Sequence, residues 1–182
     1  MGCNTRLADA FIATFSSGGQ QRVIVQDAAS LIDDSSMFET IRMRRPDFVV
    51  NCLVEAGVDR AETDPTKCRE INHDLPVRLA IACREFGAAL VQLSTDYIFD
   101  GQKDIAYFED DAPNPLNLYG QSRLEAEFDV RSLLDQHIIL RVSHLFAPGP
   151  FSFIANLLSM ARMENELSMI EDERGCPTSI YD

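Results

Sequence analysis

Short apolar runs rich in β-branched residues alternate along the chain with longer stretches whose apolar residues recur at helical spacing. We predict strands at 22–25, 47–50, 88–93 and 137–142, and a shorter strand at 167–170. Helix candidates lie between them, and the clearest stripe repeats at Leu75, Leu79, Ala82 and Phe86. Strands that alternate with helices are typical of βαβ units. The pattern therefore predicts a Rossmann-like α/β fold built on a doubly wound parallel sheet.

Capping signals mark where several of these helices begin and end. Ser36 and Glu39 form a capping-box pattern, which predicts a helix start. Asp64 followed by Pro65 predicts a second helix start, because proline is favoured in a first helical turn. Gly87 predicts the end of a helix that leads directly into the next strand.

Both ends of the chain depart from this pattern. A helix candidate at 7–15 comes first, although a doubly wound fold begins with a strand. We therefore expect the sheet to lack its first strand, which would leave two interior edges without ladder partners. The chain stops at 178–182, where a further helix would begin. We expect a truncated dinucleotide-binding domain at 1–150 and, at 151–182, the start of a substrate-binding region whose C-terminal part is absent.

The composition limits the classes of partner. The net charge of the 182 residues is -13, so the protein repels phosphate backbones and anionic membrane surfaces. No apolar run is long enough to span a membrane, and we predict neither nucleic acid nor membrane as a partner. Five scattered cysteines without a C-x-x-C pair argue against a zinc site and fit a reducing cytoplasm. We assign no metal, and the sequence leaves a homo-oligomer open.

The strand at 88–93 and the helix after it carry the best candidate for chemistry. Thr95 follows the strand, and Tyr119 opens the helix. A hydroxyl at a strand end that faces a phenol on the next helix presents proton donors to a substrate carbonyl. The pair therefore predicts carbonyl reduction. The alternative for the segment 94–97 is an ordinary polar turn.

Arg123 lies one helical turn after Tyr119. A cation at this spacing shares the helix face of the phenol and stabilises its ionised form. Lysine is the residue expected there, and arginine is planar, longer and effectively never deprotonated. We therefore predict reduced or absent turnover. The alternative is a surface arginine on a solvated helix face.

The N-terminal segment occupies the place of a dinucleotide-binding turn, but Gly2 is its only glycine. Thr5 and Ala8 add side chains where the backbone would approach a pyrophosphate. Asp27 follows the strand at 22–25 and could accept hydrogen bonds from a ribose 2′-hydroxyl, which would favour NADH over NADPH. The alternatives are a frayed N-terminus and an aspartate that only caps a turn.

Several ordered strings between residues 45 and 178 are specific to one branch of a known family. They are RPDFVVN at 45–51, VDRAE at 58–62, LSTDYIFDG at 93–101, PNPLNLYG at 113–120 and DERGCPT at 172–178. With these strings the chain resembles the dTDP-4-dehydrorhamnose reductases, extended short-chain dehydrogenases/reductases of rhamnose biosynthesis. The resemblance implies an oxidoreductase that uses NADPH or NADH to reduce a nucleotide-linked 4-keto sugar.

The resemblance also implies roles for individual residues. Thr95 would steady the substrate C4 oxygen, Tyr119 would protonate it, and Arg123 would hold the nicotinamide ribose. Cofactor contacts would come from Gly2, Leu7, Asp27, Asn51, Cys52, Leu53, Asn72, Tyr119 and Arg123. Substrate contacts would come from Val58, Ser94, Thr95, Asp96, Tyr97, His144 and Arg174.

Departures from the family pattern gather on the cofactor side. Cys52 and Leu53 replace small alanines, and bulkier groups there reduce the space for a dinucleotide. His144 and Phe146 stand where the family carries Trp and Tyr. Three interpretations follow: an active or impaired reductase, a non-catalytic binding or regulatory relative like the methionine adenosyltransferase β subunit, and a fragment of a functional reductase.

Overall fold

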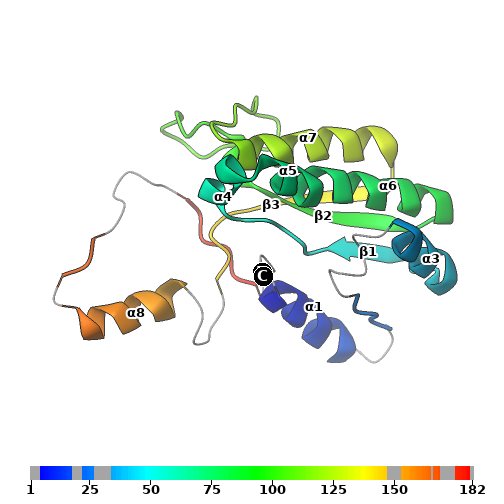
Figure 1. Cartoon of the computed structure of the whole chain (residues 1–182), viewed down its shortest axis with the longest axis horizontal. Helices are drawn as coiled ribbons and strands as arrows, with labels where there is room; N and C mark the ends of the chain where they lie inside the picture. Colours follow the sequence, from blue (N-terminus) through cyan, green and yellow to red (C-terminus); the bar gives the residue numbers. More distant parts are fainter. Residues whose placement is uncertain are drawn as a thin grey trace. The chain divides into compact units, whose positions relative to one another are not determined.

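The computed structural model describes residues 5–17, 22–26, 34–146, 153–164, 166–168 and 175–180. The chain divides into two compact units, Met1–Arg141 and Val142–Asp182. The helices and strands, shown in Figure 1, are α1 (Thr5–Ser17), α3 (Asp34–Arg44), β1 (Phe48–Asn51), α4 (Val58–Thr63), α5 (Pro65–Arg69), the π-helical turn η1 (Glu70–Asp74), α6 (Leu75–Phe86), β2 (Ala89–Thr95), the 3₁₀ turn η2 (Asp96–Ile98), α7 (Leu118–Leu133), β3 (His137–Val142) and α8 (Phe153–Met163).

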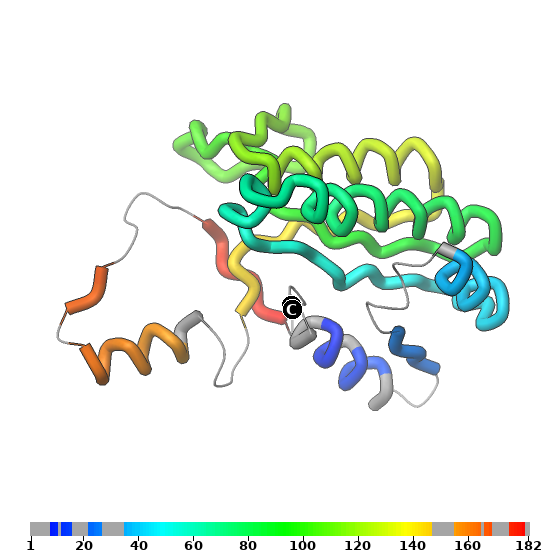
Figure 2. The backbone as a smooth tube through the Cα atoms, viewed as in Figure 1, coloured from blue at the N-terminus to red at the C-terminus, as the bar shows by residue number. Residues whose placement is uncertain are grey.

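The sheet has three strands in the order β1-β2-β3, and they run side by side in Figure 2. β1 and β2 are parallel, with Val50 opposite Val91 and Asn51 opposite Gln92. The backbone N–H of Leu90 donates to the carbonyl of Gln136 at 3.0 Å, which joins the beginnings of β2 and β3. Helices connect consecutive strands, so the predicted α/β class with a parallel sheet is confirmed.

Two strand predictions differ from the structure. Residues 22–26 form no strand, and the side chains of Val23, Ile24 and Val25 are exposed. A strand forms only where a neighbour accepts its backbone hydrogen bonds, and this segment has no ladder partner among the described residues. The prediction at 22–25 is therefore wrong. Of the strand predicted at 167–170, residues 167 and 168 are not in a strand, and 169–170 lie outside the described residues.

The helix boundaries follow two of the three capping signals. Asp64 accepts the backbone N–H of Lys67 at 3.1 Å, and α5 begins at the following residue, Pro65. Gly87 adopts a left-handed backbone with φ of 78° and ends α6, a conformation that glycine takes without steric cost. The capping-box prediction at Ser36 is wrong, because α3 begins earlier, at Asp34, and Glu39 instead pairs with Arg42.

A buried apolar core joins one face of the sheet to the helices. Met37 from α3, Leu79 from α6 and Leu90 from β2 belong to this core together with Val130 of α7. Helices α6 and α7 accordingly lie on the same side of the sheet in Figure 1. Side chains on the opposite face of β1 and β3 are exposed, with Phe48 at 63% and Ile138 at 50%. The described part of unit Met1–Arg141 therefore buries one sheet face far more than the other.

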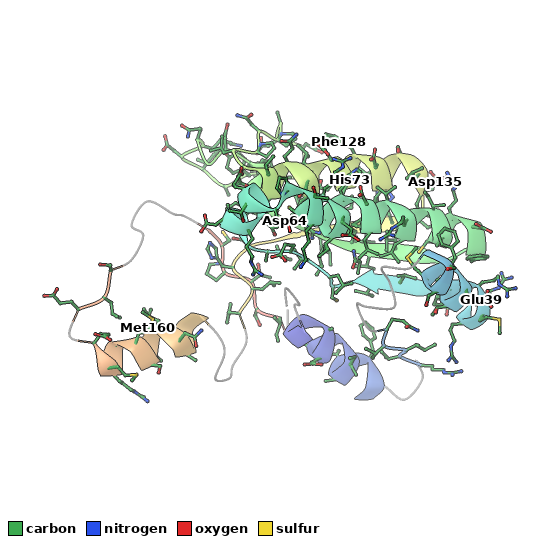
Figure 3. All side chains as sticks on the ribbon, viewed as in Figure 1. Glu39, Asp64, His73, Phe128, Asp135 and Met160 are labelled. Atoms are coloured by element: carbon green, nitrogen blue, oxygen red, sulfur yellow. The ribbon has the colours of Figure 1, made fainter. Side chains whose placement is uncertain are left out.

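A polar contact fastens η1 to α7. The ring nitrogens of His73, labelled in Figure 3, lie 2.6 Å from Asp74 Oδ1 and 2.8 Å from Asp129 Oδ2. Because Asp129 belongs to α7, this contact fixes the helix that carries Tyr119 against the π-helical turn.

Candidate active site

Thr95 is the last residue of β2, and its hydroxyl shapes the turn that follows. The Oγ1 atom accepts the backbone N–H of Tyr97 at 3.2 Å and donates to Asp96 Oδ1 at 3.2 Å. The side chain therefore caps the short η2 turn. The structure thus holds the hydroxyl at the carboxyl end of a parallel strand, where open α/β sheets place their ligands.

Two caps fix the first turn of α7. Asn117 accepts the backbone N–H of Gly120 at 2.8 Å, and Glu62 accepts that of Leu118 at 2.9 Å. These acceptors satisfy donors that a helix N-terminus otherwise leaves free. Tyr119 therefore has a fixed position in the first turn, as the sequence predicts.

The first turn of α7 lies against the turn that follows Thr95. A Cβ atom added to Gly120 would lie only 2.1 Å from the carbonyl oxygen of Tyr97, so only glycine allows this approach. The rings of Tyr97 and Tyr119 meet edge to face, with centroids 5.6 Å apart. The structure therefore brings Tyr119 to the segment that contains Thr95, and the catalytic roles of the two residues stay predictions.

Tyr119 is 8% exposed and belongs to a small apolar cluster with Val54, Ala61 and Cys68. Val58 and Tyr97, both predicted to contact substrate, pack against the same cluster. The structure therefore gathers part of the predicted substrate-binding set around the phenol.

Arg123 is buried, with 2% of its surface exposed, so the alternative of a solvated surface arginine is wrong. Its Nη2 atom donates to the carbonyl oxygen of Leu93. Its Nε and Nη1 atoms have no hydrogen-bond partner in the described part of the chain. Burial lowers the pKa of Arg123, and electrostatic interactions with Tyr119 and Glu127 oppose this effect. The guanidinium thus keeps two buried donors that no described side chain or carbonyl uses.

Asn51, predicted to contact the cofactor, has its amide engaged within the protein. Its Nδ2 atom donates to Gln92 Oε1 at 2.9 Å, and its Oδ1 atom accepts the backbone N–H of Leu53 at 3.1 Å. The Leu53 side chain packs against the main core, and Cys52 is half-buried. The structure therefore uses the end of β1 largely for internal contacts.

Asn72, a second predicted cofactor contact, is fully buried in η1. Its Oδ1 atom accepts the backbone N–H of Glu55, and its Nδ2 atom donates to the carbonyl of the same residue, both at 3.0 Å. This two-point contact clamps the backbone that follows β1, and Nδ2 also donates to Cys68 Sγ at 3.3 Å, so both donors and the acceptor of the amide are used within the protein.

The remaining predicted residues lie in different parts of the chain. Ser94 is buried, and within the described ranges its hydroxyl has no partner. His144 belongs to the second unit, where it adopts a left-handed backbone with φ of 42°. A Cβ atom on Gly175 of that unit would lie 2.2 Å from the His144 ring. Gly2, Asp27 and Arg174 lie outside the described residues, and Leu7 lies in α1.

Glu127 and Gln92 lie near the site, and the sequence analysis did not predict a role for either residue. Glu127 is 1% exposed and pairs with Arg141 at 2.7 Å and Arg131 at 3.0 Å. Its position four residues after Arg123 places both residues on the helix face of Tyr119. Gln92 is a polar residue inside an apolar strand, which signals a buried amide that requires partners.

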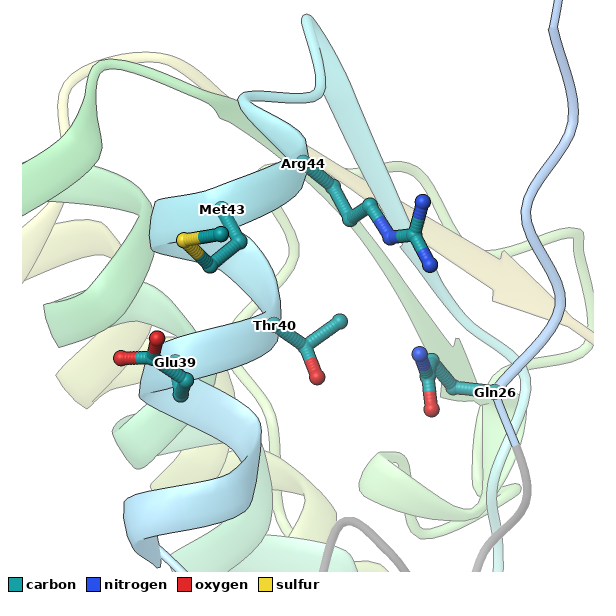
Figure 4. A pocket seen from close by; sticks show the side chains of 5 residues that line it. All are labelled: Gln26, Glu39, Thr40, Met43 and Arg44. Carbon is teal, nitrogen blue, oxygen red and sulfur yellow. The ribbon is translucent and has the colours of Figure 1, made fainter.

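Two hollows among the described residues are lined by residues other than Thr95, Tyr119 and Arg123. One lies between the segment 22–26 and α3, and the side chains of Gln26, Thr40 and Arg44 line it (Figure 4). The other lies beside the start of α7. The described residues contain no group of three metal-ligating side chains and no helix long and apolar enough to cross a membrane.

A parallel α/β sheet whose strands are connected by helices defines a Rossmann-like class of protein, and Thr95 and Tyr119 lie at its strand end and following helix. The family described as RmlD substrate binding domain matches residues 1–182. The chain belongs to this family.

Individual relatives agree with this assignment. A dTDP-4-dehydrorhamnose reductase of Sinorhizobium fredii is 38% identical over 148 residues, which are 81% of this chain and 50% of that protein. The reductase of the same name from Escherichia coli is 37% identical over 140 residues, or 77% of this chain and 47% of that protein. The chain therefore spans about half the length of these curated relatives.

Solved structures confirm the predicted fold class. A dTDP-4-dehydrorhamnose reductase from Clostridium acetobutylicum has a TM-score of 0.89 and 30% identity, and the match covers 96% of this chain and 62% of that one. The Bacillus anthracis reductase, solved in complex with NADP, has a TM-score of 0.84 and 27% identity over 90% of this chain and 59% of that one.

Proposed function

We propose that this chain provides the proton-donating part of an NAD(P)H-dependent reductase that acts on a nucleotide-linked 4-keto sugar of the dTDP-4-dehydrorhamnose type. One observation carries the proposal. The first turn of α7 approaches the turn after Thr95 at Gly120, and this approach holds Tyr119 beside the end of β2. The relatives named dTDP-4-dehydrorhamnose reductase support the substrate class.

The chain's own residues would manage the proton. As the carbonyl carbon C4 receives a hydride, its oxygen takes a proton from Tyr119 Oη, and the C=O group becomes CH–OH. Thr95 Oγ1 would turn its proton from Asp96 to the same oxygen, because a hydroxyl donates only one hydrogen bond at a time. Water would then return a proton to the Tyr119 oxygen and complete the cycle.

The buried hydrogen-bond donors of Arg123 are chemically suited to a nicotinamide cofactor. Arg123 has two donor nitrogens, Nε and Nη1, without partners among the described residues, and ribose hydroxyl oxygens are acceptors of matching chemistry. Arg123, Asn51 and Asn72 are the described polar residues that would hold this group. When bound, the cofactor would supply the hydride.

A direct assay tests the proposal. NADPH and NADH are titrated separately into the 182-residue chain, and nicotinamide fluorescence is followed with and without dTDP-4-dehydrorhamnose. The proposal expects nucleotide binding, followed by loss of reduced nicotinamide only when the sugar nucleotide is present. Absence of binding by both nucleotides would reject the reductase function.

A second candidate function is a non-catalytic binding or regulatory relative. The internal hydrogen bonds of Asn51 and Asn72 and the burial of Arg123 favour it, because a cofactor would have to compete with contacts already made. The same titration separates the two candidates. Binding of a sugar nucleotide without oxidation of NADPH or NADH would support the non-catalytic function.

A further inference from the structure

Gln92 is a buried amide in the middle of β2, with 1% of its surface exposed. Both the oxygen and the nitrogen of this side-chain amide form hydrogen bonds within the protein. Oε1 accepts Asn51 Nδ2 at 2.9 Å, and Nε2 donates to the carbonyl oxygen of Leu93 at 2.8 Å. A glutamine in this position links β1 to the backbone of its own strand.

The carbonyl oxygen of Leu93 also accepts a second donor, which comes from α7. Arg123 of α7 donates to it through Nη2. The carbonyl therefore joins the side chains of Gln92 and Arg123, which come from different elements. With the contact to Asn51, a continuous series of hydrogen bonds runs from the end of β1 to α7.

The series reaches both sides of the proposed site. At one end, Asn51 Oδ1 accepts the backbone N–H of Leu53 and shapes the turn after β1. At the other end, Arg123 lies one helical turn from Tyr119, on the same face of α7. A change at Gln92 would therefore affect both the turn after β1 and the face of α7 that carries Tyr119.

Burial makes this series sensitive to a single lost partner. Asn51 is 3% exposed and Arg123 is 2% exposed, so bulk water has little access to either side chain. In such surroundings hydrogen bonds are strong, and a half-satisfied network is costly. The Leu93 carbonyl is the only acceptor that Arg123 has among the described residues. The position of the guanidinium consequently depends on this carbonyl.

We propose that Gln92 is a positioning residue that couples the end of β1 to the face of α7 that carries Tyr119. Without the Gln92 donor, the Leu93 carbonyl and Arg123 adjust their positions, and Tyr119 moves with the helix face. The effect on turnover rests on the proposed function, whereas the movement of Tyr119 does not.

Fluorine NMR of the 182-residue chain, with 3-fluorotyrosine in place of tyrosine, reports on Tyr119 directly. Gln92→Met keeps the size of the side chain and removes both hydrogen bonds. Its matched control is Gln136→Met, the same change at an exposed side chain. Tyr119→Phe assigns the resonance of Tyr119, and Tyr107, whose hydroxyl donates to Asp100 in the loop before α7, serves as an internal reference.

The coupling predicts that Gln92→Met shifts the Tyr119 resonance and leaves that of Tyr107 in place, while Gln136→Met shifts neither. A folded Gln92→Met chain with an unchanged Tyr119 resonance would overturn the proposal. If Gln92→Met does not fold, Asn51→Ala breaks the series at its other end. An unshifted Tyr119 resonance in that variant would equally overturn it.

Steady-state kinetics distinguish the positioning role of Gln92 from the reductase function. Gln92→Met should lower kcat for reduction of dTDP-4-dehydrorhamnose about tenfold or more, with KM unchanged, because it misplaces the donor without removing a substrate contact. A rise in KM alone would contradict a positioning role. A wild-type chain without turnover, whose Tyr119 resonance responds to Gln92→Met, would reject the reductase function and retain the coupling.

Discussion

The rings of Tyr119 and Tyr97 meet at a steep angle, and Tyr119 belongs to an apolar cluster. The sequence predicted its place at a helix start, because Tyr119 opens a stretch with a helical pattern. The burial of Arg123 was not predictable from the sequence. It depends on the carbonyl of Leu93, an acceptor thirty residues away that only the folded sheet brings into reach.

Tyr119→Phe tests the proton donor at this scale. The variant keeps the aromatic ring in its cluster and removes only the hydroxyl, so we expect a folded chain whose turnover falls by about 10² to 10⁴-fold. Turnover is measured as loss of NADPH absorbance with dTDP-4-dehydrorhamnose. Tyr107→Phe is the control, because its hydroxyl donates to Asp100 in a loop outside the site. Equal turnover in Tyr119→Phe and wild type would exclude Tyr119 as the donor.

The hydrogen bonds that Asp100 accepts in the loop before α7 should weaken at acid pH. Hydrogen bonds from Tyr107, Asn114 and the backbone of Gln102 lower its pKa from 3.8 to about 2. Because the folded state binds this proton less readily, these contacts are fully present above pH 3.8 and are lost as the pH falls towards 2. A carboxyl ¹³C NMR titration should find a lower pKa for Asp100 in wild type than in Tyr107→Phe. An identical pKa in both chains would contradict this prediction.

Helix α7 organises the site at the scale of elements, because one of its faces carries Tyr119, Arg123 and Glu127 in succession. Local signals predicted several boundaries, such as the strand at 137–142 and the helix end at Gly87, because caps and alternation act within a few residues. The strand predicted at 22–25 failed for a non-local reason. Its apolar residues suit a strand, but pairing requires a neighbour that the described sheet does not provide.

Gly120→Ala tests how closely α7 approaches the turn after β2. The added methyl group would meet the carbonyl oxygen of Tyr97 at 2.1 Å, so the helix must shift. We expect a loss of unfolding free energy of about 1–3 kcal/mol, as for other overpacked sites, measured by urea denaturation. Gly57→Ala is the matched control, because its new atom would meet mainly the flexible side chain of Arg60. Equal stability of Gly120→Ala and wild type would show that the approach is not tight.

Glu127→Gln tests the buried ion pair that joins α7 to β3. Arg141 would lose its ion pair with the Glu127 carboxylate, whose side chain is only 1% exposed. Because an unpaired buried charge typically lowers the unfolding free energy by about 3–5 kcal/mol, we expect a loss of this size. Glu125→Gln on the same helix removes a half-exposed pair with Arg69 and should cost about 1 kcal/mol or less. Urea denaturation of both variants measures the difference. Similar losses in the two variants would contradict the structural importance of Glu127.

At the scale of the whole molecule, the chain has one well-buried sheet face and spans about half the length of its curated relatives. Phe48, Val50, Ile138 and Leu140 are exposed on the opposite face. The sequence predicted the fold class because alternation of strands and helices is a property of the entire chain. It did not predict this exposed face, since alternation alone does not say which side a helix will cover.

The exposed face should bind an apolar dye. We expect the fluorescence of anilinonaphthalene sulfonate to rise with the 182-residue chain, because contiguous exposed apolar surface on a folded protein is uncommon. Phe48→Ser combined with Ile138→Thr should reduce this signal. Thr40→Ser on α3 serves as a control that leaves the face unchanged. An equal dye signal in the double variant would show that the dye binds elsewhere.

The outer edge of β1 has a consequence for the protein in concentrated solution. Among the described strands β1 pairs with β2 alone, so its other side has no ladder partner in the described sheet. Such an edge is a template onto which a strand from any chain can add, and each addition exposes a fresh edge for the next. If no other segment covers this edge, we expect self-association that rises with protein concentration, which light scattering across a dilution series measures.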